Sequence, residues 1–267
     1  MKTIEEIVKE IENNPVEKGG HIYHPIPFPE FSHLKTSSSR EEALKKWGLI
    51  ERRLNKIFPD GMAGRKALDV GANAGFYTYT LAKIGAEVTA FEPHPRYSKI
   101  GGVIAREKGL NIKWNPEAFS ADSLSEDDYF DFALMLSVFQ WISEGNDKLD
   151  YACETLKKLS SKSDMLFFEL GVNTGASAVK AACLNKIGFI YRLLKENTDY
   201  QHVALVGTTN IWPSVKYDDS FARRTVLLIR DRLIKHKPSG KRFLFLCSKE
   251  KVNIREPWFS FVKYLNI

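Results

Sequence analysis

One stretch, residues 67–95, constrains the fold of this chain more than any other. It reads ALDVGANAGFYTYTLAKIGAEVTAFEPHP. An apolar run at 67–70 leads into a glycine-containing turn, a helical segment at 76–84, and a second apolar run at 87–91 that ends at Glu92. Two short apolar strands joined by a helix pair in parallel, because the helix carries the chain back to the starting edge. The stretch therefore predicts a β-α-β unit with its turn and its acid at one edge of a sheet.

The same alternation continues along the chain. Helical segments, such as 148–159, separate further short apolar runs. The additional strand candidates are residues 111–115, 130–137, 165–170, 202–206, 224–229 and 242–247. Short apolar strands that alternate with helices indicate a sheet covered on both faces. We therefore predict an α/β fold with a doubly wound, mostly parallel sheet of about seven strands.

The glycine turn narrows the choice of ligand. A dinucleotide-binding turn needs the pattern G-x-G-x-x-G, but the third and sixth positions counted from Gly71 are Asn73 and Phe76. Gly75 still allows a close approach of chain or ligand. Glu92 follows the second strand, and a carboxylate there can accept hydrogen bonds from both hydroxyls of a ribose. A ribose without a pyrophosphate is the specification of S-adenosyl-L-methionine (SAM). Taken singly, the glycines are also compatible with an ordinary turn and Glu92 with a solvated acid.

Residues 69–76, DVGANAGF, together with FEP at 91–93, resemble motifs I and II of class I SAM-dependent methyltransferases. The similarity is strongest to the FkbM-type group, which methylates polysaccharides and natural products. It extends over residues 65–170 and is weaker in the remainder. The resemblance implies a Rossmann-like fold, SAM as the methyl donor and S-adenosyl-L-homocysteine (SAH) as the product.

The resemblance also implies a set of cofactor-binding residues. Asp69 and the backbone at Gly71 bind the methionine end, Glu117 and Ala118 read the adenine, and Ser137 ends the strand that faces the sulfonium. The full set is Asp69, Gly71, Asn73, Gly75, Phe76, Glu92, Pro93, Glu117, Ala118 and Ser137.

Methyl transfer from a sulfonium needs alignment, and it needs a general base only if the acceptor must lose a proton. Three side chains are candidate catalytic residues: Glu169, Gln140 and His202. Many relatives carry a histidine near Gln140, and a glutamine orients an acceptor without acting as a base. Glu169 ends an apolar strand and is either a proton acceptor or a paired structural acid. His202 begins a strand, where a core or surface histidine is the alternative.

The acceptor is expected to contact residues from several segments: Tyr23, Arg40, Trp141, Arg223 and Arg224. Forked arginine donors suit a phosphate or a carboxylate, although a solvated arginine pair and a core tryptophan are the alternatives. The spacing of His21 and His24 lacks an acidic or cysteine partner, so no metal site is predicted.

We divide the chain into a helical N-terminal cap over the active site (1–60), a SAM-binding methyltransferase core (61–232), and a C-terminal strand with an aromatic tail packed on the core (233–267). The tail could instead contact a partner subunit or a membrane surface. The charged N-terminus argues against a secretory signal, and the longest apolar run is too short to cross a bilayer, so we expect a cytoplasmic protein.

Charge and composition bear on the acceptor. Lys and Arg number 39 against 33 Asp and Glu, which gives a net charge of +6 and favours an anionic partner. We expect O-methylation of a small polar, anionic acceptor such as a sugar, a sugar phosphate or a related metabolite or glycan. A tRNA acceptor is the alternative, because residues 235–242 are basic. A non-catalytic SAM-binding protein is a third reading.

Overall fold

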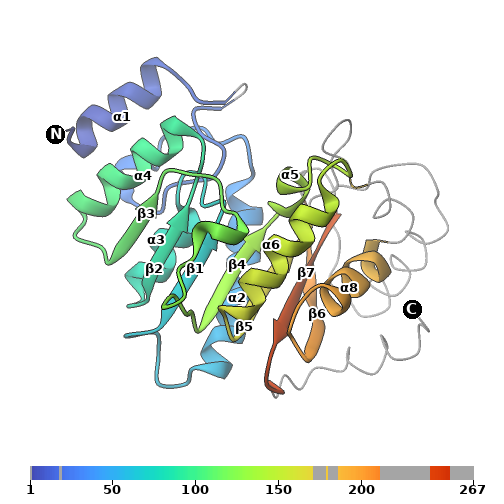
Figure 1. The fold of residues 1–267 in the computed structure, drawn as a ribbon. Coiled ribbons are helices and arrows are strands. Elements are labelled where there is room, and N and C mark those ends of the chain that lie inside the picture. Colours follow the sequence, from blue (N-terminus) through green and yellow to red (C-terminus); the bar gives the residue numbers. More distant parts are fainter. Residues whose placement is uncertain (1, 18–19, 171–178, 180–185, 211–240, 253–267) are drawn as a thin grey trace, which may run out of the picture.

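Seven strands form one sheet in the computed structural model, which describes residues 2–17, 20–170, 179, 186–210 and 241–252 (Figure 1). The strands are β1 (Lys66–Val70), β2 (Glu87–Phe91), β3 (Ile112–Asn115), β4 (Phe132–Leu136), β5 (Met165–Glu169), β6 (His202–Asn210) and β7 (Lys241–Ser248). Their order across the sheet is β3-β2-β1-β4-β5-β7-β6. The pairs from β3 to β5 are parallel, and β7 runs antiparallel to both β5 and β6. The predicted mostly parallel α/β sheet is confirmed, while the strand expected at 224–229 falls outside the described residues.

Helices cover both faces of the sheet, which explains why its central strands are apolar throughout. They are α1 (Ile4–Asn13), α2 (Arg40–Ile57), α3 (Phe76–Lys83), α4 (Pro95–Glu107), α5 (Phe139–Ile142), α6 (Leu149–Ser161) and α8 (Lys186–Glu196), with 3₁₀ turns η1 (Pro29–Phe31) and η2 (Ala121–Ser123). One core joins Leu68 and Val70 of β1 to α6 and α8. A second core joins Ala67 to α2 and α3 on the opposite face. Figure 1 shows α6 and α8 in front of the strands, with α2 and α3 behind them.

The first 60 residues pack in two places. Helix α1 begins at a capping box of Thr3 and Glu6, and its buried Ile7 and Ile11 share a core with α4. Helix α2 follows its N-cap Ser39, whose hydroxyl accepts from the N–H of Glu42, and lays its apolar stripe directly against the sheet. The division of the chain into cap, core and tail stays a prediction.

Strand order reverses between β1 and β4, because the chain leaves β1 toward β2 and β3 and then returns to the other side. Ligands of doubly wound sheets bind beyond the carboxyl ends of the strands at such a point. The parallel registers bring Gly71, Glu92, Ser137 and Glu169 to this one edge. The edge is therefore the place to look for a site.

Candidate functional site

The turn after β1 is held in one conformation by its own hydrogen bonds. Gly71, Asn73 and Gly75 have φ values of 75°, 54° and 89°, in the left-handed region that glycine and asparagine tolerate best. Backbone N–H groups throughout the turn are engaged: Gly71 and Ala72 donate to Phe91 O, Asn73 to Glu92 Oε2, Ala74 to Asn73 Oδ1 and Gly75 to Ala72 O. The turn thus presents a rigid surface whose N–H groups are already satisfied.

The glycines of this turn are also required by close packing. A Cβ at Gly71 would lie 2.4 Å from Cγ2 of Val138, just after β4, and one at Gly75 would lie 2.4 Å from the ring of Tyr79. Side-chain contact between the ends of β1 and β4 is therefore tight at the point where strand order reverses. This tightness fixes the turn relative to Ser137, which itself has a φ of 61°.

Glu92 is fixed by two backbone donors at the end of β2. Oε2 accepts from the N–H of Asn73 at 2.7 Å and Oε1 from the N–H of His94 at 2.8 Å. Burial raises the pKa of this carboxyl, and the two backbone hydrogen bonds oppose that shift. Each oxygen retains a second lone pair, so a carboxylate held this way can accept from two neighbouring hydroxyls. The arrangement fits the ribose diol of a nucleoside.

Asp69 lies beneath the turn rather than on its surface. Its side chain is buried, and Oδ2 accepts from the hydroxyl of Thr78 in α3 at 2.6 Å. Burial raises the pKa of Asp69 to about 6, against the opposing hydrogen bond from Thr78. In this structure Asp69 ties β1 to α3.

A second polar cluster surrounds Glu169 at the end of β5. The carboxylate is fully buried; Oε2 accepts from Lys46 Nζ at 2.6 Å and from the Ser137 hydroxyl, and Oε1 accepts from Thr209 at 2.7 Å. Arg242 Nη1 donates to Ser137 Oγ at 2.6 Å and lies 3.7 Å from Glu169 Oε2. Helix α2 and strands β4, β5, β6 and β7 thus meet at one carboxylate.

The two cations of this cluster govern its titration. Burial would raise the pKa of Glu169, but Lys46 and Arg242 outweigh it and hold the pKa at about 2. Burial also lowers the pKa of Lys46, although the charge of Glu169 opposes that shift. Glu169 is therefore a carboxylate near neutral pH, and as an ion-paired acid it is a weak proton acceptor.

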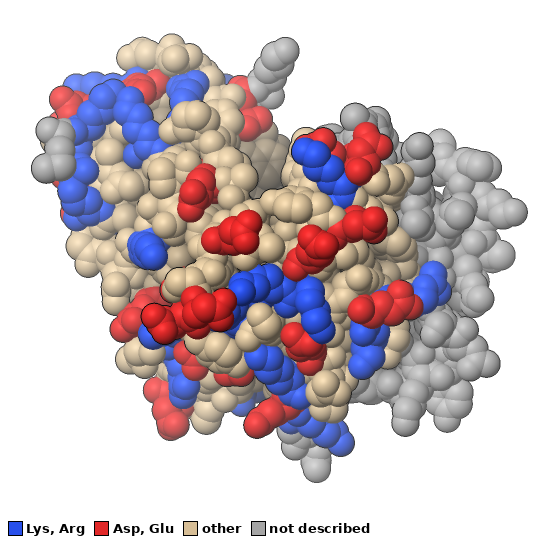
Figure 2. All heavy atoms as spheres, in the orientation of Figure 1, with Lys and Arg blue, Asp and Glu red and all other residues tan. Residues whose placement is uncertain are grey.

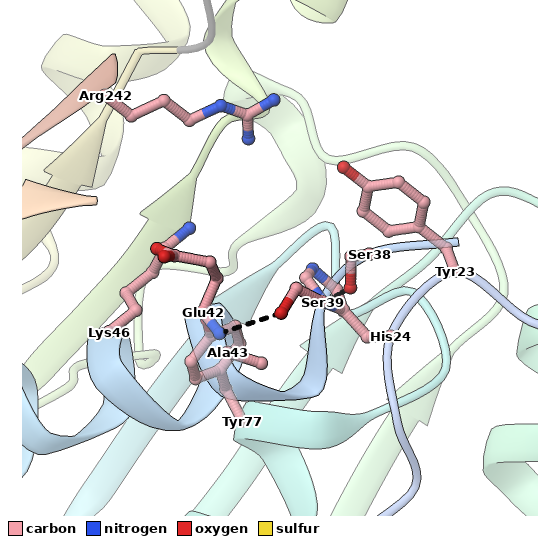
Figure 3. A pocket seen from close by; sticks show the side chains of 9 residues that line it. All are labelled: Tyr23, His24, Ser38, Ser39, Glu42, Ala43, Lys46, Tyr77 and Arg242. Atoms are coloured by element: carbon pink, nitrogen blue, oxygen red, sulfur yellow. Dashed lines mark hydrogen bonds between the residues drawn. The ribbon is translucent and has the colours of Figure 1, made fainter. Parts of the chain in front are cut away.

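A pocket opens beside this cluster (Figure 3). The space between its walls, counted together with the part that opens to solvent, is about 340 Å³. Its lining consists of Tyr23, His24, Ser38, Ser39, Glu42, Ala43, Lys46, Tyr77 and Arg242. His24 forms a 2.9 Å hydrogen bond between Nδ1 and Ser38 Oγ. Burial, and then the charges of Lys46 and Arg242, lower the pKa of His24 to about 3, so the ring is neutral near pH 7. The pocket adjoins the glycine turn, because Tyr77 lies in the first turn of α3.

The structure gathers most of the predicted cofactor residues at three neighbouring strand ends. They are Gly71, Asn73, Gly75 and Phe76 after β1, Glu92 and Pro93 after β2, and Ser137 after β4. Glu117 and Ala118 are exposed and follow β3, next to β2.

The residues predicted for catalysis and for acceptor binding do not all lie at the same place in the fold. Glu169 belongs to the buried cluster, and Tyr23 lines the pocket. Gln140 is buried in α5 and donates to Ser137 O at 2.6 Å, whereas its neighbour Trp141 is 63% exposed. His202 pairs with Ser248, level with the start of β5, and therefore lies at the opposite edge of the sheet from Glu169.

Three further predicted residues lie apart from the pocket lining. Arg40 is exposed at the start of α2 and does not line the pocket. Arg223 and Arg224 fall outside the described residues.

Sequence reasoning missed Lys46, Tyr77 and Arg242. Lys46 could have been identified from the sequence, because it falls on the apolar stripe of α2 between Ala43 and Ile50. An unpaired charge at such a buried position would be costly, so a buried partner could have been expected. Tyr77 and Arg242 had no comparable signal in their local sequence.

Comparison with known proteins gives a family match within the described fold. Residues 68–161 match the sequence model of a family described as methyltransferase domain. A ubiquinone biosynthesis O-methyltransferase from a Caulobacter species is 29% identical over 168 residues, which cover 62% of this chain and 61% of that protein. A protein of the same name from Burkholderia orbicola is 25% identical over 183 residues, covering 68% of this chain and 73% of that protein. The matched part of this chain spans 39%, 61% and 44% of the length of three curated proteins with this name, the Caulobacter protein being the second of them.

Solved structures show the same fold. The bifunctional kinase-methyltransferase WbdD is similar at a TM-score of 0.64 and 17% identity, over 92% of this chain and 47% of that chain. The N-terminal domain of EvdMO1 with SAH bound is similar at a TM-score of 0.56 and 11% identity, over 94% of this chain and 98% of that chain.

Proposed function

Because this chain belongs to the class I SAM-dependent methyltransferase family, we propose that it transfers a methyl group from SAM to an oxygen of a small polar acceptor, leaving SAH. The observation that carries the proposal is the doubly anchored carboxylate of Glu92 at the strand-order reversal. The O-methyltransferase names of the relatives support an oxygen acceptor.

The residues of the turn would hold the cofactor. Glu92 accepts from the ribose hydroxyls, while the rigid turn from Gly71 to Gly75 sets the position of the amino-acid arm. Glu117 and Ala118 after β3 remain the proposed adenine contacts. SAM, when bound, supplies an already activated methyl group, so the protein mainly aligns the two reactants and excludes water.

The pocket beside Glu169 would hold the acceptor. Tyr23 lines it, as the sequence predicted for an acceptor contact, and Ser137 links it to the cofactor edge. His24 is proposed to orient the acceptor. When its Nδ1–H donates to Ser38 Oγ, the neutral ring keeps Nε2 as a hydrogen-bond acceptor for the acceptor's hydroxyl, while its pKa of about 3 makes it a weak proton acceptor. Glu169 would act as a positioning residue for Lys46 and Ser137.

The described surface in view (Figure 2) favours a small acceptor over RNA, and most of the basic segment behind the tRNA alternative, residues 235–240, lies outside the described residues. On the face in Figure 2, Lys and Arg side chains are interspersed with Asp and Glu among the described residues. Several are paired, including Lys158 and Lys162 with Glu126, and Lys157 with Asp199. Nucleic-acid binding relies on clustered, unneutralised cations, and this face does not offer them. None of the helices within the described residues combines the length and apolarity that a bilayer crossing requires.

Calorimetric titration with SAM and with SAH tests the cofactor assignment. We expect wild-type affinity on the order of micromolar, and Glu92→Gln should weaken it about 10- to 100-fold, because one charged hydrogen-bond acceptor is lost. Glu87→Gln, at the exposed opposite end of β2, is the matched control and should bind like wild type. Absence of binding of either nucleoside to the wild type would refute the proposal. Incubation of cell extracts with isotopically labelled SAM, followed by mass spectrometry, would identify the acceptor.

A further inference from the structure

Two hydrogen-bonding groups in the acceptor pocket are buried without a partner. The hydroxyl of Tyr77 and Nε of Arg242 have no hydrogen-bond partner among the described residues. Tyr77 is 4% exposed, and the side chain of Arg242 is 12% exposed. Both residues line the same pocket (Figure 3). Leaving such groups unsatisfied is unfavourable, so a protein that retains two of them in one pocket is arranged for a ligand that accepts from both.

Arg242 is held so that one edge of its guanidinium stays free. Nη1 is committed to Ser137 Oγ and lies near Glu169, which fixes the plane of the group. Nε is buried and has no hydrogen-bond partner among the described residues. The parallel N–H groups along such an edge match the two oxygens of a carboxylate or a phosphate.

The helix dipole beside the pocket favours an anionic occupant, whereas the charges of the surrounding side chains balance. Lys46 and Arg242 are cationic, and the charge of Lys46 is engaged by the buried Glu169. Glu42 also lines the pocket, so two acidic side chains, Glu42 and Glu169, balance the two basic ones. The pocket therefore has an excess of hydrogen-bond donors rather than of positive charge. The first turn of α2, from Ser39, faces the pocket and adds the positive end of a helix dipole.

We propose that the pocket anchors the acceptor through an oxyanion group, a carboxylate or a phosphate, that accepts from Arg242 Nε and from the Tyr77 hydroxyl. The inference rests on the proposed function, since it names the class of acceptor that this methyltransferase would take. The anchoring group is separate from the oxygen that is methylated, which would accept the methyl group from SAM and release its proton to water. The acceptor is then a molecule that carries both a hydroxyl, which is methylated, and a separate anionic group, which is anchored.

Ligand-induced stabilisation tests the proposal without knowledge of the full acceptor. Wild-type protein saturated with SAH is melted with sodium phosphate, with sodium benzoate, and with sodium chloride at equal ionic strength. We expect at least one of the two oxyanions to raise the melting temperature beyond chloride, by linkage of binding to folding. The anion that acts more strongly identifies phosphate or carboxylate as the anchor. No stabilisation by either anion would overturn the proposal.

Variants then assign the stabilisation to this pocket. Tyr77→Phe removes only the unpartnered hydroxyl and should weaken oxyanion binding about 10- to 100-fold, and Arg242→Gln should abolish it. Tyr79→Phe, on the same helix but outside the pocket, is the control and should retain wild-type binding. Equal binding by Tyr77→Phe and wild type would overturn the proposal. SAH binding is measured on the same samples: its failure counts against the methyltransferase function, whereas retained SAH binding without oxyanion binding counts against the anchor alone.

Discussion

Replacing Glu169 by glutamine should destabilise the protein strongly, although the two side chains have nearly the same shape. The carboxylate is fully buried and accepts from Lys46, Ser137 and Thr209, with Arg242 close by. Glutamine removes the charge that compensates Lys46 and places an N–H₂ group among donors. Breaking a buried ion pair by removing one partner costs about 3–5 kcal/mol.

The titration of Glu169 points in the same direction. Its pKa of about 2, against an ordinary 4.5, corresponds to about 3 kcal/mol of preference for the ionised form, although the lowered pKa of Lys46 offsets part of it. From the cost of breaking a buried ion pair, we expect Glu169→Gln to lower the free energy of unfolding by about 3–5 kcal/mol near pH 7. Because the folded-state pKa is depressed, this stabilisation is complete above pH 4.5 and is lost as the pH falls toward 2.

Urea unfolding followed by circular dichroism measures the loss. The Lys46→Met and Glu169→Gln double variant should lose clearly less than the sum of the two single variants, because it leaves no uncompensated lysine. Lys45→Met, at the neighbouring position of α2, is the control and should change stability little. A loss below about 1 kcal/mol for Glu169→Gln, or strict additivity in the double variant, would refute the reasoning.

Two further changes probe the turn and the pocket. Gly71→Ala should cost about 1–3 kcal/mol in urea unfolding, because φ is 75° and the new Cβ would meet Val138; if the steric argument is right, adding Val138→Ala should recover part of the loss, and no recovery would contradict it. His24→Gln should flatten the acid side of the stability profile. The folded-state pKa of His24 is lowered to about 3, so the unfolded chain binds the extra proton, and wild type loses stability relative to the variant as the pH falls from 6.5 toward 3. Parallel profiles for the two proteins would show that His24 titrates normally.

The parts of the fold that follow from local patterns were predictable from the sequence. The apolar strands β1, β2, β4 and β5 fall where continuous apolar runs were read, because strands covered on both faces need apolar residues at every position. Ser39, a residue type that favours the N-cap position, caps helix α2. The proximity of the glycine turn and Glu92 was predicted from their spacing in the sequence, and the two lie together at the sheet edge.

The pocket proposed for the acceptor depends on contacts between distant segments that no local sequence pattern encodes. Lys46 and Glu169 are 123 residues apart, and their contact requires both α2 on one face of the sheet and β5 at its centre. Arg242 reaches Ser137 only because β7 inserts antiparallel between β5 and β6. An arginine at the start of an apolar strand gives no sign of which neighbour it will meet.

The position of β7 also constrains the order of assembly during synthesis. Among the described strands, β6 pairs with β7 alone, and β7 follows it in the chain. A nascent chain that stops before residue 241 therefore lacks this partner of β6 and leaves the β7-facing edge of β5 unpaired by it. Open edges invite pairing with other chains. The pocket also becomes complete late in synthesis, since its lining residues extend from Tyr23 to Arg242. A ribosome-bound fragment can thus form the strand ends that carry Gly71 and Glu92 early. It completes the pocket proposed for the acceptor only once Arg242 has emerged.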